Sequence, residues 1–238
     1  MKQFFALLLL FPAFGIAQKN LISTNRVFPK VDKVLEFEKA LAAHAQKYHK
    51  GDYAWRVFEI TSGPDAGGYH ITEGPTSWET YDTRGNLGAE HNTDYNKSVA
   101  IYLTDRGSSG YSVFQEDAST IGLTDWADKI VISHNYPKPG RIGDAMEVVR
   151  RLKPMWTASD EKIAVYTASH SGPPQIIMVT RLKNGLKELQ SGFRKPFPER
   201  FEAANGPESF RRYIADYEEA IEHRWSEILF YRADLSSK

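Results

Sequence analysis

The sequence has no cysteine and no net charge, because 30 lysines and arginines balance 30 aspartates and glutamates over 238 residues. Without cysteine there are no disulfides, thiolate metal ligands, cysteine nucleophiles or cysteine-linked lipid anchors. Nucleic acids and anionic membranes are bound by clustered positive charge, which a neutral chain does not favour. The hydrophobic share of 41% is enough for a sizeable core. We expect a folded protein of one or two domains with no nucleic-acid partner.

Signatures of several enzyme classes are also missing. No glycine-rich phosphate loop or dinucleotide fingerprint follows a strand-like segment, and no His-Glu-x-x-His motif occurs. None of the seven histidines lies four residues from another, the spacing of paired ligands on one helix face. His44 and His49 are five residues apart, so we expect them to point to different sides of a helix. We therefore predict no metal site.

One long apolar run is present, at the start of the chain. Met1–Gln3 includes a lysine, Phe4–Phe14 is apolar, and Gly15–Ala17 carries small residues. This layout predicts a secretory signal peptide over residues 1–17 with cleavage after Ala17. The alternative is a membrane anchor, but the run is shorter than the roughly 20 residues a span needs, and Pro12 interrupts it. We expect an exported protein, periplasmic or secreted, that is neither a lipoprotein nor membrane-spanning after processing.

Two short segments recur in the same order, each about 110 residues later. Ile22–Asn25 returns as Ile132–Asn135, and Ser62–Pro64 returns as Ser171–Pro173. Helical periodicity follows the first segment in each half. The apolar stripes are Val34, Phe37, Leu41, His44 and Tyr48, and then Ile142, Ala145, Met146, Val149, Leu152 and Trp156.

The remaining patterns also occur in both halves. Two strand-like stretches flank each Ser-Gly-Pro turn, at 54–61 and 68–72 and again at 162–168 and 175–181. A second helical region follows in each half, with an insertion expected at 183–205, and the halves close on strands at 111–116 and 227–232. Each half therefore reads β-α-β-β-α-β, the ferredoxin-like α+β plan. We predict two repeats, at 18–124 and 125–238, whose antiparallel sheets cover each other.

With this doubled pattern over about 21–235, the chain resembles the dimeric α/β-barrel superfamily, fused as a tandem pair. It is similar to the antibiotic-biosynthesis-monooxygenase and NIPSNAP-like branches in its Asn-bearing first strand, in Ala54–Val57 and in Gly68–Ile71. The resemblance implies two sheets packed into a barrel, often with a small-molecule pocket between a sheet and its helices. The superfamily includes cofactor-free monooxygenases, haem-degrading enzymes, haem peroxidase relatives and isomerases, so its fold does not select a function.

Three residues are candidate ligand contacts. His70 alternates with Tyr69 and Ile71, so it points into the barrel if those two pack under helices. There it can serve as an acid, a base or an axial haem ligand, or simply as a hydrogen-bonded interior histidine. The resemblance implies that Asn25, on a first strand, contacts ligand; the alternative is an asparagine that satisfies nearby backbone groups. Trp55 provides either an aromatic wall or a core residue.

Two functions remain open. The first is an exported fused barrel that binds a small molecule or a partner without catalysis, because no dense polar cluster is evident. The alternative is a monooxygenase-like enzyme, cofactor-free or haem-dependent, using Asn25, Trp55 and His70. We expect a small hydrophobic or aromatic ligand in either case, and a monomer or weak homo-oligomer.

Overall fold

The computed structural model describes residues 18–83, 87–168 and 170–238. The predicted signal segment, residues 1–17, lies outside the described residues. In the described part of the chain, no helix combines the length and apolarity that crossing a membrane requires.

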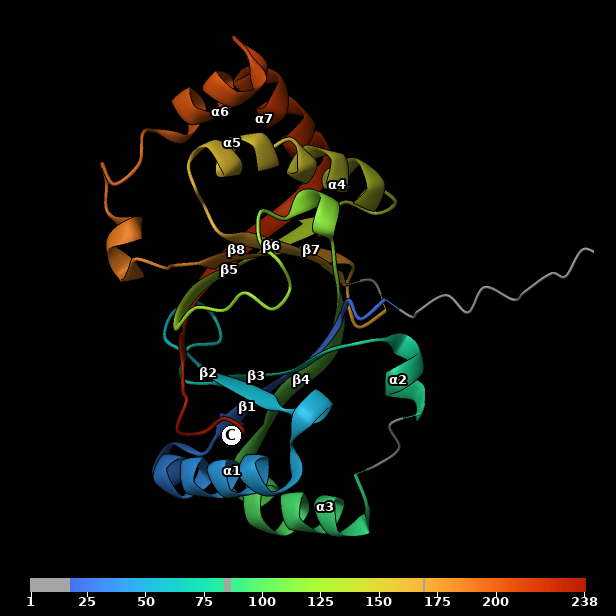
Figure 1. Ribbon diagram of the computed structural model, residues 1–238. Coiled ribbons are helices and arrows are strands. Elements are labelled where there is room, and N and C mark those ends of the chain that lie inside the picture. The colour runs from blue at the N-terminus through green and yellow to red at the C-terminus, as the bar shows by residue number, and fades with distance from the viewer. Residues whose placement is uncertain (1–17, 84–86, 169) are drawn as a thin grey trace, which may run out of the picture.

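Eight antiparallel strands close into a barrel at the centre of the molecule (Figure 1). Their order around the barrel is β1-β3-β2-β8-β5-β7-β6-β4, with β4 returning to β1. The strands are β1 (Leu21–Pro29), β2 (Trp55–Ile60), β3 (Tyr69–Thr76), β4 (Leu103–Phe114), β5 (Lys129–Pro137), β6 (Ile163–Ala168), β7 (Gln175–Arg181) and β8 (Ile221–Tyr231). The expected α+β class and the barrel of packed antiparallel sheets are confirmed.

Helices cover the barrel on two opposite sides (Figure 1). On one side α1 (Val34–Tyr48) and α3 (Ala89–Asp94) lie together, with α2 (Trp78–Thr83) nearby. The opposite side carries α4 (Ile142–Arg150), α5 (Lys153–Ala158), α6 (Phe197–Asn205) and α7 (Ser209–Ala220). Three apolar clusters result: one under each helical layer and one inside the barrel. The barrel thus has side chains packed on both faces of its wall.

The chain visits the strands in the same order in its two halves. Residues 18–124 supply neighbours in the order β4-β1-β3-β2, and residues 125–238 supply β8-β5-β7-β6. The segments after β4 and β8 then cross to the other half. Thr120 donates its amide to the Ile163 carbonyl of β6 at 2.9 Å, and Ser237 donates to the Trp55 carbonyl of β2 at 3.0 Å.

Several element boundaries differ from the expected ones. The strand expected at 111–116 begins at Leu103, and the one expected at 227–232 begins at Ile221. Both extensions are polar and largely exposed, so they lack apolar alternation, but each is held by a long ladder to β1 or β5. The insertion expected at 183–205 contains a 3₁₀ turn at Gly185–Leu189 and helix α6.

Candidate functional site

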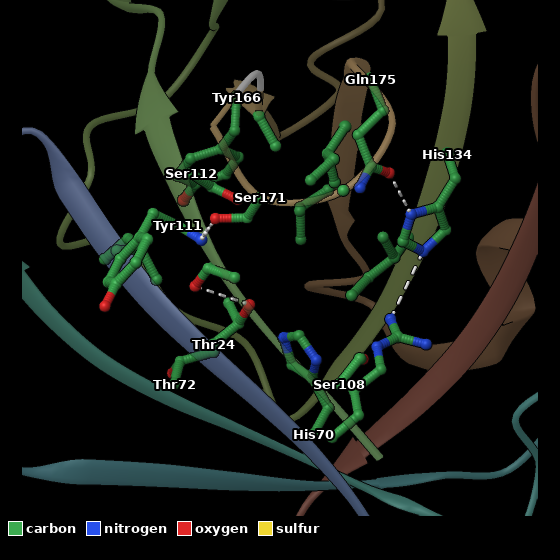
Figure 2. Close-up of a pocket in the computed structure, with 18 of the residues that line it drawn as sticks. Thr24, His70, Thr72, Ser108, Tyr111, Ser112, His134, Tyr166, Ser171 and Gln175 are labelled. Carbon is green, nitrogen blue, oxygen red and sulfur yellow. Dashed lines mark hydrogen bonds between the residues drawn. The ribbon is translucent and has the colours of Figure 1, made fainter. Parts of the chain in front are cut away.

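A cavity of about 310 Å³ lies inside the barrel (Figure 2). Alternation along the strands explains its lining, because every second side chain of a strand points to the same face. On β1 the inward residues are Ile22, Thr24 and Arg26, and on β3 they are His70 and Thr72. An eight-stranded barrel has room inside for its own side chains and one small ligand. The cavity is therefore of the size and place expected for a small-molecule site.

The wall of the cavity is largely aromatic and aliphatic. Aromatic rings come from several different strands and loops, namely Phe58, Tyr111, Trp126, Tyr136 and Tyr166. Exposed residues line one side, at Ser108–Ser109 on β4 and Gly172–Pro173 in the turn before β7. The cavity meets solvent beside these two segments.

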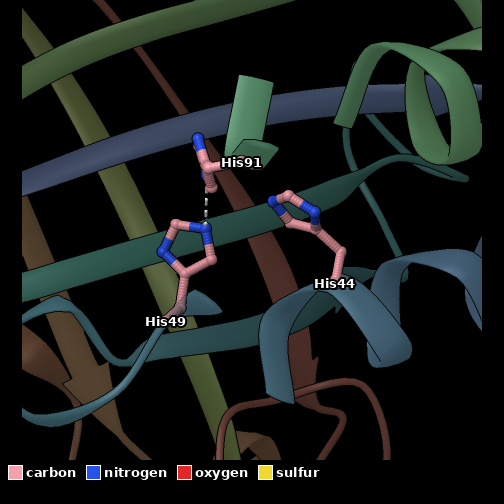
Figure 3. Close-up of side chains that lie close together, drawn as sticks. All are labelled: His44, His49 and His91. Atoms are coloured by element: carbon pink, nitrogen blue, oxygen red, sulfur yellow. Dashed lines mark hydrogen bonds between the residues drawn. The ribbon is translucent and has the colours of Figure 1, made fainter. Parts of the chain in front are cut away.

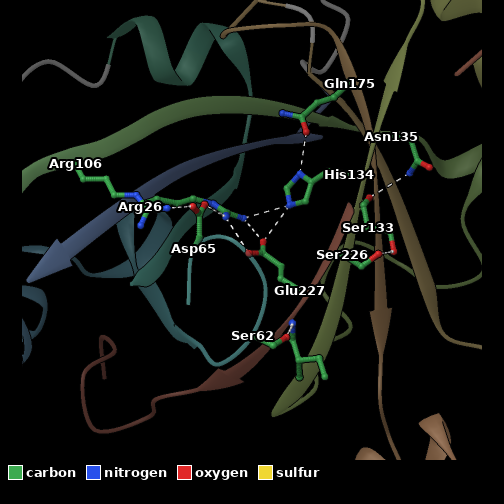
Figure 4. A network of polar contacts seen from close by, with 11 residues as sticks. Arg26, Ser62, Asp65, Arg106, Ser133, His134, Asn135, Gln175, Ser226 and Glu227 are labelled. Carbon is green, nitrogen blue, oxygen red and sulfur yellow. Dashed lines mark hydrogen bonds and ion pairs between the residues drawn. The ribbon is translucent and has the colours of Figure 1, made fainter. Parts of the chain in front are cut away.

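A buried ion-pair network closes one part of the cavity wall (Figure 4). Arg26 pairs with Glu227 on β8, with Nη1 to Oε2 at 3.1 Å, and with Asp65 at 2.6 Å. The Glu227 side chain is fully buried and Arg26 nearly so. Burial opposes the charge on Arg26, but hydrogen bonds and Coulomb attraction from Glu227 and Asp65 outweigh it and raise the pKa of Arg26. This cation is fully compensated by its partners.

His134 on β5 extends the same network. Its Nε2 lies 3.0 Å from Glu227 Oε1, and its Nδ1 lies 2.9 Å from Gln175 Oε1 on β7. Its ring stacks on Trp225, with centroids 4.0 Å apart. Both ring nitrogens are therefore occupied, and His134 is held rigidly in the wall.

His70, by contrast, has an unpaired nitrogen. It lies opposite Arg26 and Phe58 in the sheet and lines the cavity, while Tyr69 and Ile71 pack in the cluster under α1, as the alternation predicts. Its Nδ1 is buried and has no hydrogen-bond partner among the described residues. Burial, reinforced by Coulomb interactions with Arg26 and His134, lowers the pKa of His70 well below its ordinary value. A neutral imidazole thus faces the cavity.

A second group with unpaired nitrogens is the guanidinium of Arg181, which lies at the end of β7 and interacts with Tyr166. Arg181 lines the cavity and is 2% exposed, and its Nε and Nη2 have no hydrogen-bond partner among the described residues. It lies 4.7 Å from the Trp126 ring centroid, and Arg56 lies 3.9 Å from the same ring. Burial lowers the pKa of both arginines. One buried and one half-buried cation therefore flank one aromatic ring.

Of the three predicted ligand contacts, only His70 lines this cavity. Asn25 lies between the inward Thr24 and Arg26, so it faces outward, and its Oδ1 accepts a hydrogen bond from Ser109 Oγ at 2.5 Å. Trp55 packs in the cluster under α1, where its Nε1 donates to Glu73 at 3.0 Å. The structure does not bring the three residues together.

The expectation that His44 and His49 point apart is wrong. The helix α1 ends at Tyr48, and the backbone at His49 is already extended, with φ −101° and ψ 90°. The chain therefore turns back, and the ring centroids of the two histidines are 5.3 Å apart. His91, on α3, lies within 5.1 Å of both rings.

Sequence reasoning missed Arg26, Arg181 and Glu227. The signal that could have found them is a single charged residue at an inward position of an alternating strand, such as Arg181 at the end of Gln175–Arg181. Such a residue must be paired or must meet a ligand, since burying a lone charge is costly.

Haem was among the cofactors that the resemblance implies, and the barrel residues do not fit it. The porphyrin with its propionates is larger than a cavity of about 310 Å³. The one histidine nitrogen that is buried without a partner in the described lining, Nδ1 of His70, belongs to a ring that lies opposite the Arg26 cation in the β1–β3 pair. We derive no step through haem.

Comparisons with known proteins show the fold. No protein-family model and no curated protein match the chain. Among solved structures, an anthrone oxidase-like protein superposes with a TM-score of 0.57 at 12% identity, covering 90% of this chain and 92% of the other. Two solved structures described as putative monooxygenases also resemble this chain. The one from Fusobacterium nucleatum subsp. nucleatum has a TM-score of 0.54 at 13% identity and covers 89% and 91% of the chains. The one from Lactobacillus acidophilus has a TM-score of 0.51 at 10% identity and covers 93% and 97%.

Proposed function

We propose that this protein binds a small aromatic anion, a carboxylate or a phenolate, inside its barrel. The observation that carries the proposal is Arg181, a cavity-lining guanidinium that is 2% exposed with two unpaired N–H groups among the described residues. Tyr166 interacts with Arg181 but leaves these two N–H groups unsatisfied, and unsatisfied N–H groups on a buried cation are costly. An anionic ligand that supplies the missing acceptors would therefore be bound strongly.

The surroundings of Arg181 favour an aromatic ligand. Arg56 adds a second positive charge on the Trp126 ring, whereas Asp125, the acidic residue acting on Arg181, pairs with Lys183. Phe58 and Tyr166 provide flat apolar walls close by. A planar ring would stack on these walls while its charged oxygen reaches the guanidinium.

His70 and Thr72 give the ligand a second polar anchor. His70 Nδ1 and Thr72 Oγ1 are both buried, unpaired among the described residues, and part of the cavity lining. A hydroxyl on the ligand could donate to the neutral imidazole. Recognition would then need a charged oxygen at one end and a hydrogen-bonding group at the other.

A fluorescence titration with 2-naphthoate, followed through the tryptophans, tests this proposal. We expect saturable binding that weakens about 10- to 100-fold in Arg181→Met, because a hydrogen bond to a charged group contributes about 1.5–3 kcal/mol. Arg211→Met, which removes an exposed arginine on α7, is the control and should bind as the unchanged protein does. Equal binding by the unchanged protein and Arg181→Met would refute the proposal.

A second candidate is a monooxygenase-like reaction without a cofactor. Its support is His70 together with the printed names of the similar structures, which include an anthrone oxidase-like protein and putative monooxygenases. The neutral His70 would take a proton from an activated CH₂ group, and Arg181 would stabilise the anion. Oxidation of CH₂ to a carbonyl by O₂ then balances with the release of one water. Oxygen uptake with anthrone, abolished in His70→Phe, would support it; no uptake above the uncatalysed rate would exclude anthrone as a substrate.

We also propose that the barrel is a fused tandem pair of ferredoxin-like units, residues 18–124 and 125–238. The matching strand orders β4-β1-β3-β2 and β8-β5-β7-β6 support it, and so do the crossing segments after β4 and β8. In this arrangement each unit covers the inner sheet face of the other, and the cavity is shared between them. His70 lies in the first unit and Arg181 in the second, so both units contribute side chains to the same cavity.

A further inference from the structure

Three histidines gather outside the barrel, between its wall and the helices α1 and α3 (Figure 3). His44 lies on α1, His49 directly follows its last turn, and His91 lies on α3. One ring nitrogen from each comes within 4.8 Å of the others. His44 and His49 are buried and His91 is partly exposed. The cluster is separate from the cavity inside the barrel.

The Nδ1 atom of each ring faces an oxygen acceptor. His44 Nδ1 lies 2.8 Å from Asp94 Oδ2, and His91 Nδ1 lies 3.0 Å from Asn92 Oδ1. His49 Nδ1 lies 3.2 Å from the Tyr53 carbonyl oxygen, with Glu73 beside it. A carbonyl oxygen and a carboxylate only accept, so these Nδ1 atoms carry the protons of the neutral rings.

With Nδ1 protonated, the Nε2 atoms are left as bare lone pairs. Nε2 of His49 and Nε2 of His91 lie 3.1 Å apart, and Nε2 of His44 is buried without any hydrogen-bond partner among the described residues. Two lone pairs at that separation repel unless a positive charge lies between them.

We propose that His44, His49 and His91 bind one divalent transition-metal ion of the zinc class through their Nε2 atoms. Imidazole nitrogens suit zinc, copper and nickel, whereas magnesium and calcium require oxygen ligands. Three histidines leave a fourth tetrahedral position for water or a substrate group.

Surrounding groups hold the rings in the orientation that such a site needs. Metal-binding histidines usually donate their other N–H to a carboxylate or a carbonyl, which orients the ring and raises its basicity. Asp94 does this for His44, and the Tyr53 carbonyl does it for His49. Trp55 stacks on His49 with centroids 3.5 Å apart and donates to Glu73, so it fixes both.

Metal binding would draw the rings slightly together. Zinc–nitrogen distances of about 2.0–2.1 Å require nitrogens about 3.3 Å from one another. The His49–His91 pair already meets this separation, at 3.1 Å. The ligand nitrogens of the three histidines lie within 4.8 Å of one another, so the remaining movement is that of His44 toward the other two rings.

Zinc titration of the full processed chain, prepared without a histidine tag and stripped with chelator, tests the site. We expect calorimetry to give one equivalent of Zn²⁺, and Co²⁺ to give the visible spectrum of a tetrahedral nitrogen-ligated ion. His91→Ala should weaken binding at least 100-fold. Asp94→Asn, which weakens the support of His44 and loses only an exposed ion pair with Lys47 besides, should weaken binding by about 10- to 100-fold.

His223→Ala is the matched control, because His223 is exposed and outside the cluster. It should bind Zn²⁺ as the unchanged chain does. Circular dichroism checks that His91→Ala folds, and if it does not, His91→Gln replaces it, since glutamine keeps the bulk without the imidazole. Absence of stoichiometric binding in the unchanged chain, or unaltered affinity in the His91 variant, would overturn the proposal.

Discussion

Ser119 and Ser236 make the same contact on opposite halves of the barrel. Ser119 Oγ accepts a hydrogen bond from the Val165 amide of β6 at 2.9 Å, and Ser236 Oγ accepts one from the Val57 amide of β2 at 3.0 Å. Each serine follows the last strand of its own half and accepts a hydrogen bond from a backbone amide in the second strand of the other half. The two halves are thus joined at both seams by side chain as well as backbone, beyond the short ladders of β2 with β8 and β4 with β6.

This exchange predicts that neither half is stable alone. Residues 18–124 expressed separately would expose Ile22, Phe58 and Phe114, which pack against the other half inside the barrel. Apolar surface of several hundred Å² marks an interface or an aggregation hazard. We expect the fragment to precipitate or to form a dimer that imitates the intact barrel, whereas the intact chain is a monomer or a weak oligomer. Light scattering that shows a cooperatively folded monomeric fragment would contradict the shared core.

The ion pair of Arg26 and Glu227 predicts a large loss of stability when one partner is neutralised. Glu227→Gln leaves a buried guanidinium with only Asp65 and should lower the free energy of unfolding by about 3 kcal/mol. Urea denaturation measures the change. Glu36→Gln, at an exposed ion pair with Lys33, is the control and should unfold like the unchanged protein. A loss no larger than that of the control would mean that Arg26 finds other compensation.

Arg181 predicts the opposite outcome for stability. Two nitrogens of its buried guanidinium have no partner among the described residues, so replacing it by the apolar side chain of methionine should raise the free energy of unfolding by about 1 kcal/mol, even as it removes ligand binding. Thermal unfolding without ligand gives the measurement. If Arg181→Met is clearly destabilised, the guanidinium is a structural group and its role in binding loses support.

His70 predicts a dependence of stability on pH. Its folded pKa is depressed, so below the ordinary value near 6.5 the unfolded chain binds a proton that the folded chain does not. Stability is therefore fully present above that value and falls as the pH decreases, by up to about 1.4 kcal/mol per pH unit for this residue. Unfolding free energies of His70→Gln, measured from neutral to mildly acidic pH, should show a shallower slope. An identical slope would show that His70 is protonated in the folded state, and His223→Gln serves as the matched control.

For residues 1–17 we propose removal on export, as the apolar run and the small residues before Gln18 indicate. Intact-mass analysis of the exported protein should give a chain that begins near Gln18. Substituting Ala17 by a large charged residue should block processing and leave a precursor of higher mass. Recovery of an exported protein that retains Met1 would refute cleavage.

Many of the helices and strands could be predicted from local sequence patterns. The helix Val34–Tyr48 and the strand Gln175–Arg181 follow from apolar spacing, because period and amphipathicity are properties of neighbouring residues. The inward orientation of His70 followed in the same way from its alternation with Tyr69 and Ile71. The polar first part of β4 could not be found in this manner, since its ladder to β1 holds it and not its own composition.

The sequence by itself determined most of the elements, their order and the inward face of His70, since these depend on contacts between close neighbours in the chain. Only the tertiary structure decided which side chains meet. Arg26 and Glu227 are 201 positions apart and lie on strands that do not pair, and His91 reaches His49 only through the packing of α3 against α1. Barrel closure sets such contacts through strand order and helix packing, and no local period encodes them.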